Sequence, residues 1–432
     1  MTGRQLHAFI NERLVGVLGE RGDVWSFTYD ASWLDDSEGF ALSPALSLQP
    51  APLVDGASDR PVQWYFDNLL PEEGLREIYA REASLSDQDA FGLLTFYGRE
   101  SAGSLTLIPQ GGSLKEERGR RKLSDEALSA RIRNLPRVPL IHDAPKHMSI
   151  AGAQHKLLVL YDGDRLYEPF GGAVSTHILK PNHPGEAYPS SVINEYFVMR
   201  LARDVGLSVP NVFRRYVPEP VYLVERFDRL RDPSGTRRRH VIDSCQLLNR
   251  ARTFKNAAAT PTSLAAIADA CRGKAAARLA LYRWLVFNLL VGNADNHLKN
   301  ISAMVDASGI ELAPAYDLLS TAVYLTPAYS EQPTWPHVEL ALPLPDAPQL
   351  GAVARQHVLA AAAQLGVPPF VATRELDRLV QAVPAAAQDL VAAIERDNAK
   401  LPAVVRPALG GELRLLRTIQ HVVIADVAER LR

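Results

Sequence analysis

The pattern of apolar residues changes near residue 260, and this change limits the possible folds more than any other feature of the sequence. Before it, apolar runs are short, alternate with polar residues and stop at Gly, Pro or Asp-Gly, as β-strands do. After it, Ala- and Leu-rich stretches follow helical spacing. These helices are expected at 264–271, 275–291, 352–365, 375–383, 385–398 and 413–431. We therefore predict an α+β fold with a β-rich lobe, a helical lobe and a ligand-binding cleft between them.

The β-rich part contains two groups of strands separated by a charged segment. An antiparallel meander is expected over residues 6–29, followed by helices at 62–70 and 87–97, the second capped by Asp87 and ended by Gly98. Residues 109–121 are Gly-rich and then charged, which favours an exposed linker. The remaining strands are expected at 104–108, 156–161, 165–170, 176–180, 212–217 and 221–226, with a hairpin turn at Asp162-Gly163 and one helix at 191–205.

Composition excludes several classes of protein. The 432 residues carry a formal net charge of -2, so a DNA contact would need a local patch or a partner. The only two cysteines, Cys245 and Cys271, exclude a disulfide framework and a Cys-rich zinc site. No apolar run approaches the roughly 20 residues that span a bilayer, and the first residues lack the apolar core of a signal peptide. We expect a cytoplasmic protein without membrane contact.

A hairpin within the helical half is flanked by residues suited to phosphoryl transfer. It is expected at 301–305 and 310–312, with Asp295 and Asn300 before it and Asp317 after it. Phosphoryl transfer needs a carboxylate for the attacking hydroxyl and oxygen ligands for Mg²⁺ on the nucleotide phosphates. Protein kinases use the same D-x-x-x-x-N spacing followed by a later Asp. Taken alone, the spacing also fits a polar turn whose side chains cap the local backbone.

Three features of the β-rich half fit the same chemistry. Residues 149–156 (SIAGAQHK) form an expected loop of small residues whose N–H groups can approach phosphate oxygens, although it is neither a Walker motif nor a kinase Gly-rich loop. Lys180 ends an apolar strand, as does the kinase lysine that holds the α and β phosphates. Glu195 lies on the only helix of that lobe, where we expect an ion pair with Lys180. Taken singly, each feature also fits a strand connection or a surface charge.

Eight motifs follow one another along the chain. They are 64–71 (WYFDNLLP), 98–103 (GRESAG), 149–154 (SIAGAQ), 179–181 (LKP), 194–195 (NE), 224–229 (VERFDR), 293–300 (NADNHLKN) and 314–317 (PAYD). Together they resemble the HipA family of bacterial serine/threonine kinases, the toxins of HipBA-type toxin–antitoxin pairs. The resemblance extends over nearly the whole chain and implies a two-lobed protein-kinase-like (HipA-like) fold.

The resemblance also implies roles for individual residues. Asp295 is expected as the catalytic base, with Asn300 and Asp317 as Mg²⁺ ligands. Lys180 is expected at the ATP phosphates, Glu225 and Phe227 at the adenine hinge, and Asp228 near the ribose. The full set of implied nucleotide contacts is Ala151, Gly152, Ala153, Gln154, Lys156, Lys180, Glu225, Phe227, Asp228, Gln246, His297 and Tyr316.

Ser149 matches the serine that family members phosphorylate on themselves, after which the loop is expelled and ATP no longer binds. Without the resemblance, its hydroxyl would be assigned to a helix cap or a turn. His155 and Asn296 depart from the residues usual in the family, and neither change removes a required ligand. His155 adds a titratable group beside the phosphates. Residues 237–240 (RRRH) favour a solvated loop over a phosphate contact.

The implied function is that of a Mg²⁺- and ATP-dependent protein kinase, the toxin partner of a HipB-like helix-turn-helix antitoxin that carries the DNA contact. Its implied substrate is a translation component such as glutamyl-tRNA synthetase. Two alternatives are a small-molecule or lipid kinase, which the N-terminal extension disfavours, and a catalytically idle co-repressor, which the intact site residues disfavour. The implied division is 1–112 for an N-terminal β-rich subdomain, 113–135 for a charged linker and helix, 136–250 for the N-lobe-like region and 251–432 for the helical C-lobe.

Overall fold

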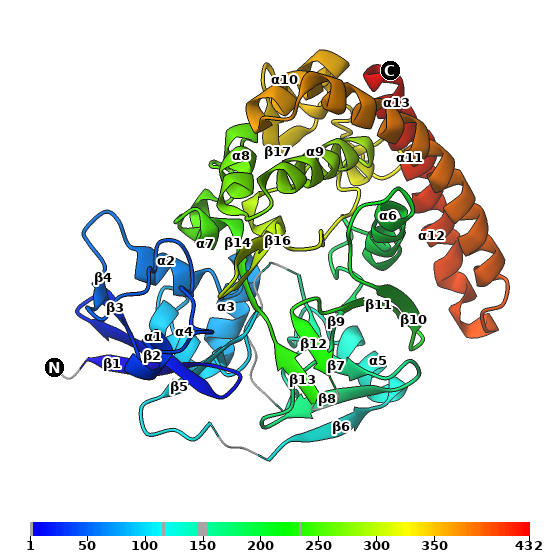
Figure 1. Cartoon of the computed structure of the whole chain (residues 1–432). Helices are drawn as coiled ribbons and strands as arrows, with labels where there is room; N and C mark the ends of the chain where they lie inside the picture. The colour runs from blue at the N-terminus through cyan, green and yellow to red at the C-terminus, as the bar shows by residue number, and fades with distance from the viewer. Residues whose placement is uncertain (1–2, 115–116, 146–151, 153, 233–234) are drawn as a thin grey trace.

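The computed structural model describes residues 3–114, 117–145, 152, 154–232 and 235–432. Its N-terminal part contains a five-stranded antiparallel sheet in the order β4-β3-β2-β1-β5 (Figure 1). The strands are β1 (Arg4–Ile10), β2 (Arg13–Arg21), β3 (Val24–Tyr29), β4 (Leu53–Val54) and β5 (Leu105–Pro109). Strands β1 to β3 pair in sequence order, as the predicted meander requires.

Helices of the N-terminal part accompany this sheet. They are α1 (Ala31–Leu34), α2 (Pro61–Asp67), α3 (Glu73–Glu82) and α4 (Ala90–Tyr97). The expected cap of α4 is wrong: the helix begins at Ala90, and Asp89 Oδ1, not Asp87, accepts a hydrogen bond from the N–H of Gly92 at 2.9 Å. The apolar pattern does not predict α3, because Glu and Arg residues interrupt it.

A second antiparallel sheet has six strands in the order β10-β11-β9-β7-β8-β6. Its elements are β6 (Gly119–Leu123), α5 (Asp125–Arg133), β7 (Leu157–Tyr161), β8 (Leu166–Phe170), β9 (His177–Pro181), α6 (Ser191–Asp204), β10 (Val212–Tyr216) and β11 (Pro220–Glu225). The expected hairpin joins β7 to β8, and α6 packs against β10 and β11. The expected linker is partly wrong, because β6 pairs with β8 as an edge strand whose exposed charges suit an unpaired edge.

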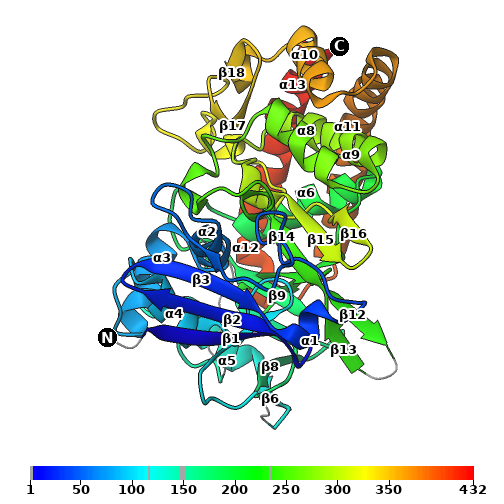
Figure 2. The same ribbon diagram turned by 60° about the vertical axis from the view of Figure 1, so that its left-hand side comes forward.

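A small sheet lies between the β-rich parts and the helices (Figure 2). It consists of β14 (His240–Asp243), β15 (Ser302–Asp306) and β16 (Gly309–Leu312), and β15 with β16 is the predicted hairpin. A two-stranded ribbon, β12 (Arg229–Asp232) with β13 (Gly235–Arg238), precedes it. The remaining elements are α7 (Ser244–Leu247), α8 (Pro261–Ala270), α9 (Lys274–Leu290), β17 (Glu339–Leu344), β18 (Ala347–Gln349), α10 (Arg355–Leu365), α11 (Pro369–Asn398), α12 (Arg406–Thr418) and α13 (Ala425–Leu431).

Two predicted boundaries in the helical lobe are wrong. Residues 375–383 and 385–398 belong to one helix, α11, which runs unbroken with Pro384 inside it. An internal proline removes one backbone hydrogen bond, but buried apolar residues on both sides of Pro384 hold the two halves against the same core. The last predicted helix begins at Arg406 rather than at 413, and a π-helical segment (Ile419–Ile424) joins α12 to α13.

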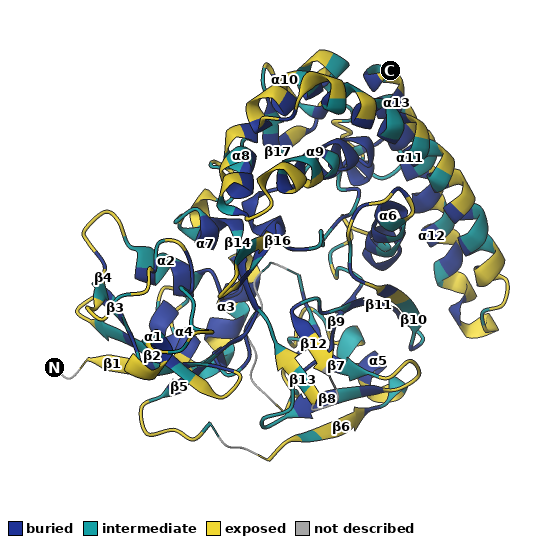
Figure 3. Ribbon diagram, in the orientation of Figure 1, coloured by how far each residue is buried: buried dark blue, intermediate teal, exposed yellow. Residues whose placement is uncertain are grey.

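One continuous hydrophobic core joins all these parts. It includes Phe27 from the first sheet, Leu179 from the second, Phe197 from α6 and Phe287 from α9, each of them fully buried. Figure 3 shows most of α6 coloured as buried where it lies between the second sheet and the C-terminal helices. This shared core packs the N-terminal part into one body with the two lobes.

In the described part of the chain, every helix is too short or too polar to cross a membrane.

Candidate active site

Lys180 links the β-rich and helical lobes at the centre of the candidate site. Its Nζ donates to Glu195 Oε1 of α6 at 2.8 Å and to Asp317 Oδ1 after β16 at 2.6 Å. The expected Lys180–Glu195 ion pair is thus present, and both side chains are buried. Burial alone would raise the pKa of Asp317, but Lys180 outweighs it and lowers that pKa to about 2. Burial raises the pKa of Glu195 to about 7 against the attraction of Lys180.

The loop between α9 and β15 carries Asp295, His297 and Asn300. Asn300 Nδ2 donates to the Asp295 carbonyl oxygen at 2.9 Å, which folds the loop back on itself. The Asp295 side chain is 64% exposed, so a substrate hydroxyl can reach its carboxylate. His297 is buried with Nε2 3.9 Å from Asp295 Oδ1. Burial lowers the pKa of His297 against the attraction of Asp295, so this imidazole is mostly neutral at pH 7.

Asn300 and Asp317 each carry a side-chain oxygen of the kind that Mg²⁺ takes as a ligand. Because Nδ2 of Asn300 makes the hydrogen bond within the loop, its Oδ1 is the atom suited to a cation. Asp317 has φ of 58°, a left-handed conformation that is uncommon for a residue with a side chain and that clusters at functional sites. Among the described residues, no group of three or more His, Cys, Asp or Glu could hold a metal. Two protein oxygens completed by phosphates and water are nevertheless a usual Mg²⁺ site.

The small-residue loop is described only at its C-terminal side, and Ser149, Ala151 and Ala153 lie outside the described residues. Gly152 has φ of 110°, and a Cβ there would lie 2.7 Å from Lys156 Nζ. The positive φ is strained for a residue with a side chain, which favours glycine where the backbone passes over this lysine. Burial and repulsion from Lys180 lower the pKa of Lys156 to about 8. The loop thus brings a backbone turn and a second lysine beside the Lys180 cluster, together with the half-buried Gln154.

The expected hinge is a tight turn after β11. The N–H of Arg229 donates to the carbonyl oxygen of Arg226 at 3.2 Å, which places Phe227 within the turn. The Phe227 ring lies against that of Tyr316, with 5.7 Å between centroids and a 32° angle between planes. The Tyr316 hydroxyl donates to the Lys299 carbonyl oxygen at 2.7 Å, so the aromatic pair connects the turn to the loop between α9 and β15. Glu225 ends β11, where Asn211 Nδ2 donates to its Oε2 at 2.7 Å.

Two residues expected at the nucleotide are used elsewhere. Asp228 is buried, and its carboxylate accepts hydrogen bonds from Arg226, Arg229 and the N–H of Gly103. Gln246 is buried as well, and its Nε2 donates to the Tyr65 carbonyl oxygen at 2.9 Å while its Oε1 accepts from a backbone N–H. The structure therefore does not bring these two side chains to the Lys180 cluster, and both hold the N-terminal part instead.

A second buried charge cluster includes Lys299 of the loop between α9 and β15, and it is not among the residues predicted from the sequence. Lys299 Nζ donates to Asn68 Oδ1 at 2.9 Å and to Asp243 Oδ2 at 2.5 Å, and it lies 3.3 Å from Glu72 Oε1. Lys255 Nζ donates to Glu72 Oε2 at 2.7 Å. The N–H of Glu72 also approaches the Gly152 carbonyl oxygen at 3.4 Å. The available signal was a charged residue in or directly beside a motif, since Lys299 lies within 293–300 and Glu72 directly follows 64–71.

The fold and these contacts together define a class of protein. A β-rich lobe carries a Lys–Glu pair, and a helical lobe presents a D-x-x-x-x-N loop, a hairpin and a later Asp to the same lysine. This is the arrangement of the protein-kinase-like fold.

Comparisons with known proteins identify the family within this class. The family model of the HipA-like C-terminal domain matches residues 148–387, and that of the HipA N-terminal domain matches residues 6–108. The serine/threonine-protein kinase toxin HipA of Shewanella oneidensis is 30% identical over 409 residues, which cover 89% of each chain. Y4mE of Sinorhizobium fredii, which is named as a kinase, is 38% identical over 342 residues, 75% of this chain and 79% of that protein.

A solved structure gives the same result. The Shewanella oneidensis complex of HipA, HipB and operator DNA contains a chain that matches with a TM-score of 0.76 and 27% identity, covering 98% of this chain and 99% of that one. The chain belongs to the HipA family of serine/threonine kinase toxins.

Proposed function

We propose that this protein is a Mg²⁺- and ATP-dependent serine/threonine protein kinase and the toxin component of a type II toxin–antitoxin module. The observation that carries this proposal is the double ion pair of Lys180 with Glu195 and Asp317 beside the exposed carboxylate of Asp295. This set of groups supplies a phosphate-binding cation, a metal ligand and a base for a hydroxyl within one site.

Each residue has one task in the proposed reaction. Asp295 accepts the proton of the substrate hydroxyl as that oxygen attacks the γ-phosphorus of ATP. Asn300 and Asp317 would hold Mg²⁺, which neutralises charge on the phosphates when it is bound. When ATP binds, the Lys180 ammonium group exchanges its contact with Asp317 for a contact with the α and β phosphates. Glu195 keeps that ammonium group in place. Lys156 and His297 contact the phosphates from the loop above and the catalytic loop below.

The adenine end is proposed to lie at the turn after β11. Phe227 and Tyr316 present an aromatic surface there, and the backbone at Glu225 and Phe227 faces the adenine edge. Asp228 and Gln246 are excluded from direct contact in this proposal, because their polar atoms already have protein partners.

The proposed partner is a HipB-like helix-turn-helix antitoxin that carries the contact with DNA. The Shewanella oneidensis complex of HipA with HipB and operator DNA supports this assignment, since its HipA-like chain matches nearly the full length of the present one. The proposed substrate is a translation component in the cytoplasm, with glutamyl-tRNA synthetase as the first protein to test. Ser149 is proposed as the autophosphorylation site.

The test is transfer of labelled phosphate. Purified protein is incubated with γ-³²P-ATP, Mg²⁺ and a bacterial lysate, and labelled proteins are identified by mass spectrometry. Label should appear on a lysate protein and on Ser149 of the kinase, and both signals should vanish with EDTA. The matched control is Asp295→Asn, which preserves size but cannot accept the proton. Equal labelling by Asp295→Asn, or none by the wild type, would refute the kinase assignment.

A further inference from the structure

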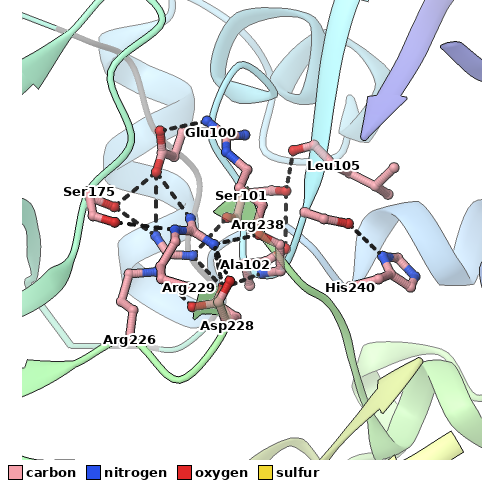
Figure 4. A network of polar contacts seen from close by, with 12 residues as sticks. Glu100, Ser101, Ala102, Leu105, Ser175, Arg226, Asp228, Arg229, Arg238 and His240 are labelled. Atoms are coloured by element: carbon pink, nitrogen blue, oxygen red, sulfur yellow. Dashed lines mark hydrogen bonds and ion pairs between the residues drawn. The ribbon is translucent and has the colours of Figure 1, made fainter. Parts of the chain in front are cut away.

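A buried charge network joins the N-terminal part to the turn that carries Phe227 (Figure 4). Its centre is Glu100, which is fully buried in the loop between α4 and β5. Glu100 Oε1 accepts from Ser175 Oγ at 2.9 Å and from Arg229 Nη2 at 3.2 Å, and it lies 3.5 Å from Arg226 Nη1. Glu100 Oε2 accepts from Arg238 Nη2 at 3.0 Å. One carboxylate thus faces three guanidinium groups.

The backbone of the same loop binds the same turn. Arg226 Nη2 donates to the carbonyl oxygen of Ser101 at 3.2 Å, and Arg229 Nη1 donates to that of Gly103 at 2.8 Å. In the opposite direction, the N–H of Gly103 donates to Asp228 Oδ2 at 2.8 Å. Gly103 has φ of 73°, and a Cβ there would lie 2.8 Å from the carbonyl oxygen of Val241. The loop therefore fits the turn through directed bonds that a small displacement would break.

Glu100 brings the buried network closer to charge balance. Arg226, Arg229 and Arg238 carry three positive charges, and Asp228 and Glu100 carry two negative ones, all nearly without solvent exposure. Buried ions of this kind are stable only while each remains paired and hydrogen-bonded. Loss of Glu100 would leave guanidinium groups that must move to find water or another acceptor.

The residues of this network flank the aromatic group of the proposed nucleotide site. Arg226 and Asp228 are the two neighbours of Phe227 in the chain, and both side chains point into the network (Figure 4). The backbone at Phe227 is therefore held on each side. Since Phe227 packs on Tyr316, and Tyr316 directly precedes Asp317, a shift of the turn changes the surface that faces the adenine.

We propose that Glu100 of the N-terminal part is a positioning residue of the nucleotide site, which sets the place of Phe227 through its bonds to Arg226, Arg229 and Ser175. This inference rests on the proposed kinase function. On this proposal the N-terminal part contributes to the nucleotide site, because its buried carboxylate Glu100 affects how tightly ATP binds at the turn that carries Phe227.

The test compares two hydroxyl deletions at the same domain boundary. Ser175→Ala removes the hydroxyl that bridges Glu100 and Arg226, and the control Ser104→Ala removes an equally buried hydroxyl that bonds to His240 instead. Neither changes a charge, so both variants should fold. We expect Ser175→Ala to raise the KM for ATP about threefold and Ser104→Ala to leave it unchanged. Equal KM values for the two variants would overturn the inference.

Glu100→Gln extends the test to the charge itself. In protein that retains a cooperative thermal transition, the KM for ATP should rise about tenfold or more, while kcat changes much less, because Asp295 and the metal ligands are untouched. A purely structural role would lower the melting temperature without this division between KM and kcat. If the variant does not fold, the serine pair decides the question. Wild-type protein that fails to bind Mg-ATP in calorimetry would refute the proposed function, whereas normal wild-type binding with unchanged variants would refute only the role of Glu100.

Discussion

The buried histidine at the start of β14, His240, bonds to the N-terminal part and should make this protein sensitive to mild acid. His240 is 4% exposed, its Nε2 donates to the Leu42 carbonyl oxygen at 2.9 Å, and its Nδ1 accepts from Ser104 Oγ at 2.9 Å. This arrangement uses the neutral imidazole with the proton on Nε2. Burial lowers the pKa of His240 from 6.5 to about 4, although the hydrogen bond to Leu42 opposes the shift.

The size of the effect follows from linkage between protonation and folding. The pKa is lower in the folded protein, so the unfolded chain binds the proton first, and stability is lost as pH falls below about 6.5 toward 4. With these two values, His240 should cost about 2 kcal/mol of stability at pH 5 and almost none at pH 7.5. The loss should approach about 3 kcal/mol well below pH 4.

The assay is urea unfolding of the wild type and His240→Gln at pH 7.5 and pH 5.0. Glutamine keeps an N–H donor for Leu42 but does not titrate in this range. The variant should be less stable than the wild type at pH 7.5, and the difference should shrink by about 2 kcal/mol at pH 5.0. His177, whose pKa burial lowers to about 4, contributes equally to both proteins and cancels. A difference that is the same at both pH values would refute the argument.

The remaining predictions concern the site itself. Asp295→Asn should keep the fold and lower kcat by a factor of about 10² to 10⁴ in a phosphate-transfer assay, and a wild-type rate would remove its role as base. Lys180→Ala should weaken Mg-ATP binding at least about tenfold in calorimetry, and unchanged affinity with unchanged turnover would exclude this lysine. Asp317→Asn should abolish the Mg²⁺ dependence of ATP binding. Glu72→Gln should lower kcat about tenfold with little change in the KM for ATP, whereas Glu77→Gln, exposed on the helix α3 that begins directly after Glu72, should match the wild type.

Local sequence patterns were sufficient to predict the helices and strands that neighbouring residues stabilise. The Asp162-Gly163 turn and the strand alternation around it predict β7 and β8, and the long apolar helix and its hairpin predict α9, β15 and β16. The errors arise where tertiary contacts decide. Pro384 interrupts a hydrogen bond but not the apolar face of α11, and the charged strand β6 exists because β8 offers it a partner edge.

The candidate site likewise contains some contacts that the sequence predicts and others that it does not. The Lys180–Glu195 pair is predictable, because one strand and the helix that follows it carry the two charges. The contacts that tie Asp228 to Gly103 and Gln246 to Tyr65 are not predictable, because these partners are far away in the sequence. Their polar character alone fits a ligand contact equally well. Only the packed structure shows that these groups are already paired.

The N-terminal part reaches the proposed site at two separate points, and these should affect different kinetic constants. Glu100 holds the turn at the adenine end, so its loss should act on the KM for ATP. Glu72 faces Lys299 of the loop that carries Asp295, the proposed base, so the loss of Glu72 should act on kcat. Among the described residues, Glu100 contacts a serine and arginines, whereas Glu72 contacts lysines, and effects of independent sites add. Tyr316 is the physical link between them, since its ring packs on Phe227 and its hydroxyl binds the Lys299 carbonyl oxygen. If the effects of Glu100→Gln and Glu72→Gln are not additive in the double variant, the difference should become smaller when Tyr316→Phe is added. A difference of the same size without the Tyr316 hydroxyl would show that this hydroxyl does not couple the two residues.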